Sequence, residues 1–205
     1  MGSRIGFGMQ CFWGAEAIFG SLDGVYTTRV GYAGGSTPTP TYKNLADHIE
    51  TVEVVFDESR LTLNSLLDTF FKSHDPTTKY KRQYISAIFY YDEEQRKTIN
   101  NWIEQHSFNF SKPIVTEIIK NEHFHNAENY HQKYHLRKHN DILSELKLND
   151  EQIITSSIAT RLNAFCAGFG SLKQLKEGNF NISPKSKKEL LTLICEGPNL
   201  SECGI

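Results

Sequence analysis

Short stretches in which apolar and polar residues alternate predict strands in the first two thirds of the chain. The alternation over 25–33 places Tyr26, Thr28, Val30 and Tyr32 on one face, because successive side chains of a strand point to opposite faces. Sheet segments are also predicted at four other places, namely a strand ending near Gln10 and segments over 51–56, 85–91 and 114–119, the last of the sheet.

Helices are predicted where apolar residues recur at every third or fourth position. The clearest stripe is formed by Leu66, Leu67, Phe70 and Phe71, with Thr62 as the capping residue before it. Two more helices are expected, one from Phe12 or Trp13 to about Gly20, and one carrying Ile99, Trp102 and Ile103 behind a capping box of Asp92 and Gln95.

The pattern changes after about residue 141, where helical stretches replace the β-like runs. The first covers the apolar residues from Ile154 to Phe165, and the second begins with Ser183 and Pro184 and ends near Cys195. The tail after Cys195 is rich in Gly, Pro, Asn and Ser, so we expect it to be mobile.

These elements predict an α+β protein. We expect a ferredoxin-like order β-α-β-β-α-β, with a mixed, mostly antiparallel sheet and helices on one face, over a first domain of residues 1–140. Residues 141–205 are expected to form a helical and irregular C-terminal extension that packs on the same domain.

Composition and charge narrow the class of protein. The 205 residues carry 22 Lys and Arg against 24 Asp and Glu, a formal net charge of −2, so no excess of positive charge favours a nucleic acid or an anionic membrane. No apolar run approaches the roughly 20 residues that span a bilayer, and the first ten residues lack a signal-peptide pattern. We expect a cytoplasmic monomer without nucleic-acid or membrane partners.

Cys11 lies where a strand is expected to meet a helix. A thiol at a helix N-terminus faces unpaired amides and the positive end of the helix dipole, which lowers its pKa and favours a nucleophile. The alternative is a small buried residue. The aromatic residues Phe12 and Trp13 follow directly, and at least one of them should border a cleft that encloses an apolar methyl or thioether group.

Glu50 precedes the strand over 51–56 and shares the parity of Val52, Val54 and Phe56. Its carboxyl should therefore point to the buried side of the sheet, where burial raises the pKa and keeps a proton available near neutrality. The alternative is an exposed charge at the end of a strand.

Five histidines lie close together in one segment and suggest a competing metal site, His123, His125, His131, His135 and His139. The last three are spaced for one helix face, as metal ligands would be. No carboxylate or thiolate is interleaved at matching spacing, and Lys133, Arg137 and Lys138 would repel a divalent cation. A solvated helix face is therefore expected, and no metal.

Seven ordered blocks resemble the peptide methionine sulfoxide reductase A family, and its insect and invertebrate branch in particular. They are GMQCFWGAE at 8–16, GYAGG at 31–35, PTY at 40–42, HIE at 48–50, HDPT at 74–77, QYISAI at 83–88 and AENYHQKY at 127–134. The resemblance covers residues 5 to about 140. One departure is Lys79, which stands where the family usually has an aspartate five residues before Tyr84.

The resemblance implies that the chain reduces methionine S-sulfoxide, free or in a polypeptide, to methionine. Cys11 would attack the sulfur and become a sulfenic acid, while Glu50 protonates the oxygen and Tyr42 and Tyr84 bind it. The residues implied to bind the substrate are Phe12 and Trp13, as a wall for the S-methyl group, with His131 and Tyr134 at its border. No cofactor is implied, since thioredoxin or a small dithiol supplies the reducing equivalents.

Three cysteines remain candidates for the thiol that resolves the sulfenic acid. The apolar neighbours of Cys166 suggest a buried thiol, whereas Cys195 and Cys203 flank a tail of the kind that carries recycling cysteines in this family. The working hypothesis is that Cys195 attacks Cys11 and that Cys203 then opens this disulfide.

A rival interpretation is a methionine-binding or redox-sensing module that keeps Cys11 and its aromatic neighbours without turning over. The two interpretations differ in stoichiometry, because a sensor forms one sulfenic acid per protein and stops, whereas an enzyme consumes many sulfoxides when dithiothreitol is present.

Overall fold

Six strands form one mixed sheet in the computed structural model, which describes residues 2–203. In chain order they are β1 (Ser3–Gly8), β2 (Val25–Ala33), β3 (Ile49–Phe56), β4 (Ala87–Tyr90), β5 (Glu117–Lys120) and β6 (Phe124–Asn126). Across the sheet the order is β5-β4-β1-β3-β2-β6, and only the β4–β5 pair is parallel among these strands. Strand β6 was not predicted, so the expectation that the sheet ends within 114–119 is wrong.

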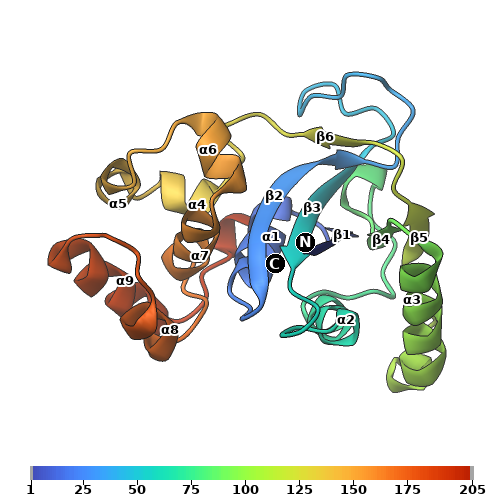
Figure 1. Ribbon diagram of the computed structural model, residues 1–205. Helices are drawn as coiled ribbons and strands as arrows, with labels where there is room; N and C mark the ends of the chain where they lie inside the picture. Colours follow the sequence, from blue (N-terminus) through green and yellow to red (C-terminus); the bar gives the residue numbers. More distant parts are fainter. Residues whose placement is uncertain (1, 204–205) are drawn as a thin grey trace.

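Three helices cover one face of this sheet (Figure 1), α1 (Phe12–Gly20), α2 (Leu63–Lys72) and α3 (Glu93–His106). Phe7 of β1 stacks on Phe19 of α1 at 4.6 Å and on Phe70 of α2 at 5.1 Å between ring centroids, which places both helices on the same side. The elements run β1-α1-β2-β3-α2-β4 along residues 3–90. The α+β class is confirmed.

The local signals at α2 and α3 are largely confirmed. Thr62 caps α2, because its hydroxyl accepts the Ser65 N–H at 3.2 Å, and the Asp92 carboxylate accepts the Gln95 N–H at 2.8 Å. The reciprocal half of the predicted capping box is absent, since the Gln95 side chain accepts the N–H of Tyr91 instead.

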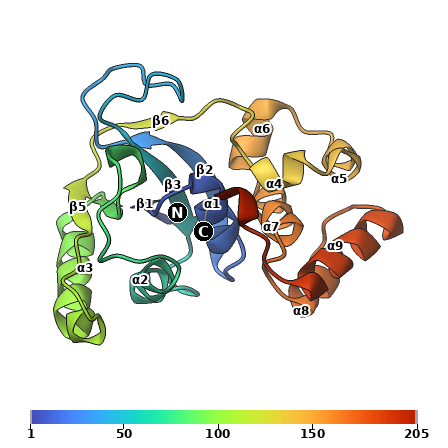
Figure 2. The same ribbon diagram turned by 180° about the vertical axis from the view of Figure 1, so that it is seen from behind.

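The C-terminal part contains more helices than expected, and they lie beside α1 and β2, away from α3 (Figure 2). They are α4 (Tyr134–Arg137), α5 (Asn140–Glu145), α6 (Asp150–Thr155), α7 (Ser157–Cys166), α8 (Leu172–Glu177) and α9 (Pro184–Glu196). The stretch expected over 154–165 is split at Ser156, which ends α6 and caps α7 through the Ala159 N–H. Helix α9 begins and ends as predicted.

Helix α7 joins the C-terminal helices to the sheet. It packs against α1, where Gly20 allows the close approach, since a Cβ there would lie 3.0 Å from the Thr160 carbonyl oxygen. The Thr160 hydroxyl accepts the Thr28 N–H of β2 at 3.2 Å. The C-terminal helices therefore pack on the sheet and its helix α1, while the domain boundary at residue 140 stays a prediction.

A buried ion pair fixes the segment before α4. The Lys133 ammonium donates to the Glu16 carboxylate at 2.7 Å and to the Thr28 carbonyl at 2.6 Å, and both charged side chains are fully buried. Lys133 itself has a left-handed backbone with φ 55°. This contact ties the 127–133 segment to α1 and β2.

Within residues 2–203, the structure contains no helix with the length and apolar character needed to cross a bilayer.

Candidate active site

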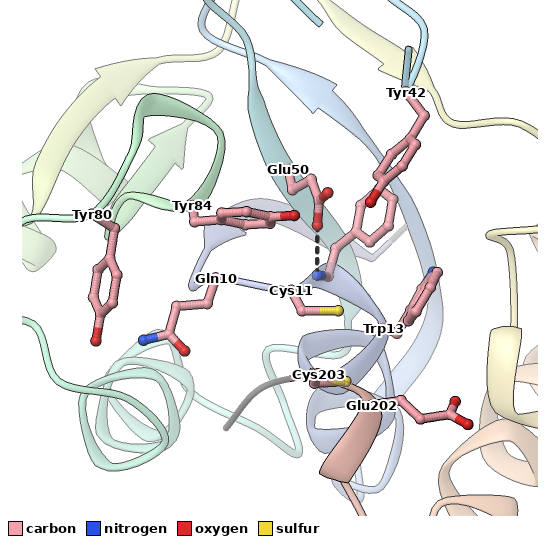
Figure 3. Close-up of a pocket in the computed structure, with 10 residues that line it drawn as sticks. Gln10, Cys11, Trp13, Tyr42, Glu50, Tyr80, Tyr84, Glu202 and Cys203 are labelled. Carbon is pink, nitrogen blue, oxygen red and sulfur yellow. Dashed lines mark hydrogen bonds between the residues drawn. The ribbon is translucent and has the colours of Figure 1, made fainter.

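A cavity of about 370 Å³ opens where β1 ends and α1 begins (Figure 3). Its lining contains two thiols, two carboxylates and several aromatic rings, from Gln10, Cys11, Phe12, Trp13, Tyr42, Glu50, Tyr80, Tyr84, Glu202 and Cys203. The cavity therefore brings together most of the side chains that the sequence predicts for the site.

Cys11 occupies the N-cap position of α1, as the sequence predicts. Its backbone is extended, with φ −65° and ψ 119°, and the preceding Gln10 turns the chain with φ 67°. The strand-to-helix junction thus presents the thiol to the cavity at the end of the helix where backbone amides lack intrahelical partners.

Glu50 is only 2% exposed and lies on the helix side of β3, as its parity predicts. One carboxylate oxygen accepts the Phe12 N–H at 3.2 Å, and the other accepts the Gln83 side-chain amide at 2.6 Å. Burial raises the pKa of Glu50 to about 7, although both hydrogen bonds favour the charged form. This carboxyl can therefore hold or release a proton at neutral pH, next to Cys11.

Tyr42 and Tyr84 reach the same point from two different segments. Figure 3 shows both hydroxyls pointing toward the Glu50 carboxyl. Burial raises the pKa of Tyr84, and the nearby charge of Glu50 and a hydrogen bond with Tyr42 add to this effect. The Tyr42 N–H donates to Glu128 at 3.0 Å, which holds its loop in place. Two hydroxyls beside a carboxyl can bind an oxygen atom.

Trp13 forms an aromatic wall of the cavity together with Phe12. The Trp13 ring stacks on Tyr134 at 3.7 Å between centroids, and its indole N–H donates to Nδ1 of His131 at 3.0 Å. Burial lowers the pKa of His131. His131 and Tyr134 do not line the cavity and contact the Trp13 ring that does, and their place at the border of the substrate stays a prediction.

Cys203 enters the cavity from the C-terminal tail and lies against Cys11. A hydrogen bond between the two thiols lowers the pKa of Cys203 to about 5 and raises the pKa of Cys11. The lowered pKa predicted for Cys11 is therefore wrong for this arrangement. The pair shares one proton, and amides of the helix terminus act on both thiols, because the Trp13 N–H favours the Cys11 thiolate and the Gly14 N–H favours the Cys203 thiolate.

The other two cysteines lie outside this cavity. Cys195 is exposed near the end of α9, and Cys166 is buried in α7, where burial raises its pKa. The structure thus places Cys203 beside Cys11 rather than Cys195, which reverses the spatial order assumed in the sequence hypothesis.

The five histidines do not share a helix face. Helix α4 comprises only Tyr134–Arg137, because the left-handed Lys133 separates His131 from it, and His139 precedes α5. In residues 2–203 no group of three or more His, Cys, Asp or Glu side chains is arranged to hold a metal ion.

Three lining residues of the cavity were not predicted as site residues, namely Gln10, Tyr80 and Glu202. Two residues that hold the site from outside the lining were also missed, Gln83 at Glu50 and Glu128 at Tyr42. Gln83 directly precedes Tyr84 in the block QYISAI at 83–88. Its position next to a predicted site residue is the sequence signal that could have identified it. Glu202 had the same signal, since it precedes Cys203. Lys79, where the family aspartate is missing, is exposed, and the neighbouring Tyr80 lines the cavity instead.

Comparison with known proteins agrees with this geometry. A sequence profile described as peptide methionine sulfoxide reductase matches residues 3–161. The peptide methionine sulfoxide reductase of Drosophila melanogaster is 44% identical over 173 residues, which cover 83% of this chain and 70% of the relative.

Solved structures show the same likeness. Mxr1 from Saccharomyces cerevisiae in its reduced form matches with a TM-score of 0.62 and 29% identity, over 66% of this chain and 84% of Mxr1. Mxr1 in complex with Trx2 matches with a TM-score of 0.51 and 28% identity, over 62% of this chain and 81% of Mxr1. The profile match, the insect relative and the placement of Cys11 beside Glu50 lead to one conclusion: the chain belongs to the peptide methionine sulfoxide reductase family.

Proposed function

We propose that Cys11 reduces the S epimer of methionine sulfoxide, in polypeptides and as the free amino acid, on a ferredoxin-like scaffold. The observation that carries this proposal is the position of Glu50, a buried carboxyl with a pKa of about 7, bonded to the amide next to Cys11. Such a carboxyl is protonated often enough at neutral pH to act as a general acid.

The first step moves one oxygen atom from the substrate to the enzyme. The Cys11 sulfur passes its proton to the Cys203 thiolate and attacks the sulfoxide sulfur. Glu50 gives its proton to the sulfoxide oxygen, and Tyr42 and Tyr84 bind that oxygen. A sulfur–sulfur bond forms as the sulfur–oxygen bond of the substrate breaks. The released hydroxide then bonds to the Cys11 sulfur, the sulfur–sulfur bond breaks, methionine leaves, and Cys11 becomes a sulfenic acid. Phe12 and Trp13 enclose the S-methyl group, which favours one epimer.

The recycling order follows the positions of the thiols. Cys203 attacks the Cys11 sulfenic acid, a disulfide forms, and the oxygen leaves as water after taking up a proton. Cys195 then attacks the Cys203 sulfur, which frees Cys11 and leaves a Cys195–Cys203 disulfide. A thioredoxin-type dithiol reduces this pair, a role supported by the Trx2 complex of yeast Mxr1.

Thiols supply every electron in this scheme, so the reaction needs no bound cofactor. We further infer that the protein acts in the cytoplasm, where thioredoxin-type dithiols keep thiols reduced, and that it does so as a monomer.

A turnover count with separated sulfoxide epimers tests the proposal. With dithiothreitol in excess, the protein should convert many equivalents of a peptide that contains the S epimer and leave the R epimer untouched. Release of a single methionine per protein, followed by a stop, would identify a redox sensor instead.

A further inference from the structure

We propose that Glu202 is a positioning residue, whose bonds to a helix beside the cavity hold the Cys203 thiol against Cys11. This inference rests on the proposed function, in which Cys203 resolves the sulfenic acid, and it identifies what keeps the resolving thiol in place. The tail is defined here as residues 197–203, which follow α9. Glu202 acts through the residue next to it in this tail.

Both oxygens of the Glu202 carboxylate bind side chains from one short segment, α4 and its C-cap Lys138. The Tyr134 hydroxyl donates to one oxygen at 2.9 Å, and the Lys138 ammonium donates to the other at 2.8 Å. The Lys138 ammonium also lies 5.8 Å from the centre of the Tyr134 ring, so the two donors are close to each other. These two bonds form the Glu202 anchor, which ties the tail to residues more than sixty positions earlier in the chain.

The segment that receives the anchor is itself fixed to the wall of the cavity. The Tyr134 ring stacks on Trp13 of α1 at 3.7 Å between centroids and 3° between planes. The Leu136 N–H donates to the Asn163 side chain of α7 at 3.0 Å. Because Trp13 lies two residues after Cys11, the anchor connects the tail to the same element that presents Cys11.

Two other contacts hold the tail where it approaches α1. The Asn199 N–H donates to the Ala167 carbonyl at 3.1 Å. A Cβ on Gly14 would lie 3.4 Å from the Leu200 side chain and 3.4 Å from the Cys203 sulfur, so the tail lies directly on the first turn of α1. The apolar contact of Leu200 has no preferred direction. The anchor, in contrast, supplies two directional bonds at the residue next to the thiol, so it sets the orientation of Cys203.

The short turn at the end of the tail transmits the position of Glu202 to Cys203. Residues Ser201–Cys203 form a 3₁₀ turn, in which the Cys203 N–H donates to the Leu200 carbonyl at 2.8 Å. With three residues per turn, neighbouring side chains leave it roughly 120° apart. Figure 3 shows the result, since Cys203 points toward Cys11 and Glu202 points away from it. Fixing the carboxylate therefore fixes the direction of the thiol.

The step that the anchor serves is disulfide formation within one chain. Cys203 attacks the sulfur of the Cys11 sulfenic acid, a sulfur–sulfur bond forms, the sulfur–oxygen bond breaks, and the hydroxide leaves as water with the proton of the Cys203 thiol. The rate of such a step follows the effective concentration of one thiol at the other. Lys138 and Glu202 are about half exposed, so each bond of the anchor should change this concentration by a small factor.

The first test measures the effective concentration without any sulfoxide. A chain with Cys166→Ser and Cys195→Ser is equilibrated with reduced and oxidised glutathione. Oxidised glutathione takes two electrons from Cys11 and Cys203, which form a disulfide, and two glutathione thiols are released. The fraction of disulfide, determined by mass spectrometry, gives the equilibrium constant. Glu202→Ala should lower this constant about tenfold, and Tyr134→Phe or Lys138→Met, which each remove one donor, about threefold.

Three controls separate the anchor from a general effect on the structure. Glu196→Ala removes the same charge at the last residue of α9, outside the anchor, and should leave the equilibrium constant unchanged. Lys138→Arg keeps the charge and the donors and should match the parent chain. Lys138→Met added to Glu202→Ala should cause no further loss, because the bond is already absent.

The second test measures the attack itself. The same chain is mixed with one equivalent of sulfoxide peptide and with dimedone, at the concentration where the parent gives equal amounts of the Cys11–dimedone adduct and the Cys11–Cys203 disulfide. The ratio of the two products reports the attack by Cys203, however fast the sulfenic acid forms. Glu202→Ala should shift this ratio about tenfold toward the adduct.

The outcomes separate the two proposals. If Glu202→Ala leaves the equilibrium constant unchanged, if Glu196→Ala lowers it equally, or if the losses of Glu202→Ala and Lys138→Met add in full, the role of Glu202 is overturned. If the parent chain releases no methionine at all, the proposed function fails, while the glutathione equilibrium still decides the role of Glu202. Should Glu202→Ala not fold, by circular dichroism, Glu202→Gln replaces it in both tests, with a smaller effect in the same direction.

Discussion

Gln83 donates a hydrogen bond of 2.6 Å to the carboxylate of Glu50, a side chain whose burial disfavours the charged form. The bond stabilises the charged form and burial stabilises the neutral form. The balance leaves the pKa of Glu50 at about 7, where a small change in either contribution changes the protonation state at neutral pH.

The chemical step should be slower at high pH, because the general acid must carry its proton. The rate of methionine release in a single turnover is expected to fall as pH rises through about 7, the pKa of Glu50. Glu50→Gln should lower this rate by roughly 10²-fold or more and remove this part of the pH dependence. A variant with the parent rate and profile would show that Glu50 is structural.

Gln83→Met should move the same profile without removing the acid. The hydrogen bond from the Gln83 side-chain amide lowers the pKa of Glu50. Its loss raises this pKa above about 7 and shifts the falling limb of the pH profile to higher pH. Rapid-quench measurements of methionine release across the pH range check the direction. A shift to lower pH would contradict this account of how the carboxyl is held.

Cys11→Ser should abolish sulfoxide reduction, because a hydroxyl is a much weaker nucleophile than a thiolate at neutral pH. Methionine release with dithiothreitol in excess is the measurement. Cys166→Ser is the matched control, since its thiol is buried away from the cavity and the variant should keep turnover. Repeated turnover by the Cys11 variant would remove this residue from the reaction.

Variants of the two C-terminal cysteines, Cys203 and Cys195, should stop at different steps of the recycling reaction. Cys203→Ser is expected to release one methionine per protein with thioredoxin as reductant and to leave Cys11 as a sulfenic acid, which a dimedone adduct detects by mass. Cys195→Ser should go one step further and accumulate the Cys11–Cys203 disulfide. A Cys11–Cys195 disulfide in the Cys203 variant, at the normal rate, would restore the order expected from the sequence.

Lys133→Met should destabilise the protein strongly. It leaves the fully buried Glu16 carboxylate without its cation, and breaking a buried pair in this way costs about 3–5 kcal/mol. Lys185→Met is the control, since the Lys185–Asp141 pair is exposed and such pairs contribute about 0–1 kcal/mol. The free energy of unfolding in urea should separate the two, and equal losses would contradict the argument.

Local signals predicted much of the fold. The α2 helix starts after Thr62 and the α9 helix after Ser183, as predicted, because a capping side chain and an apolar stripe act within a few residues. Glu50 is buried as its parity in β3 predicts, since alternation along a strand is equally local. Where contacts within a few residues determine the structure, the sequence predicts it directly.

Long-range contacts explain the predictions that were wrong. The expected helix face of three histidines is interrupted at Lys133, whose backbone N–H and ammonium both donate to Glu16, more than a hundred residues away. Strand β6 has only three residues and forms by pairing with β2. The contact of Cys203 with Cys11 joins the two ends of the chain, and no local pattern reveals it.

The tail that carries Cys203 leaves α9 at Gly197, whose φ of 84° turns the chain away from the helix. A cut of the backbone in this turn would therefore separate Cys203 covalently from the rest of the protein. Proteolytic cleavage there would detach Glu202 and Cys203 from the lining of the cavity and leave the sheet and Cys11 in place. It would convert a catalyst into a stoichiometric scavenger that repairs one methionine and then waits for an external thiol.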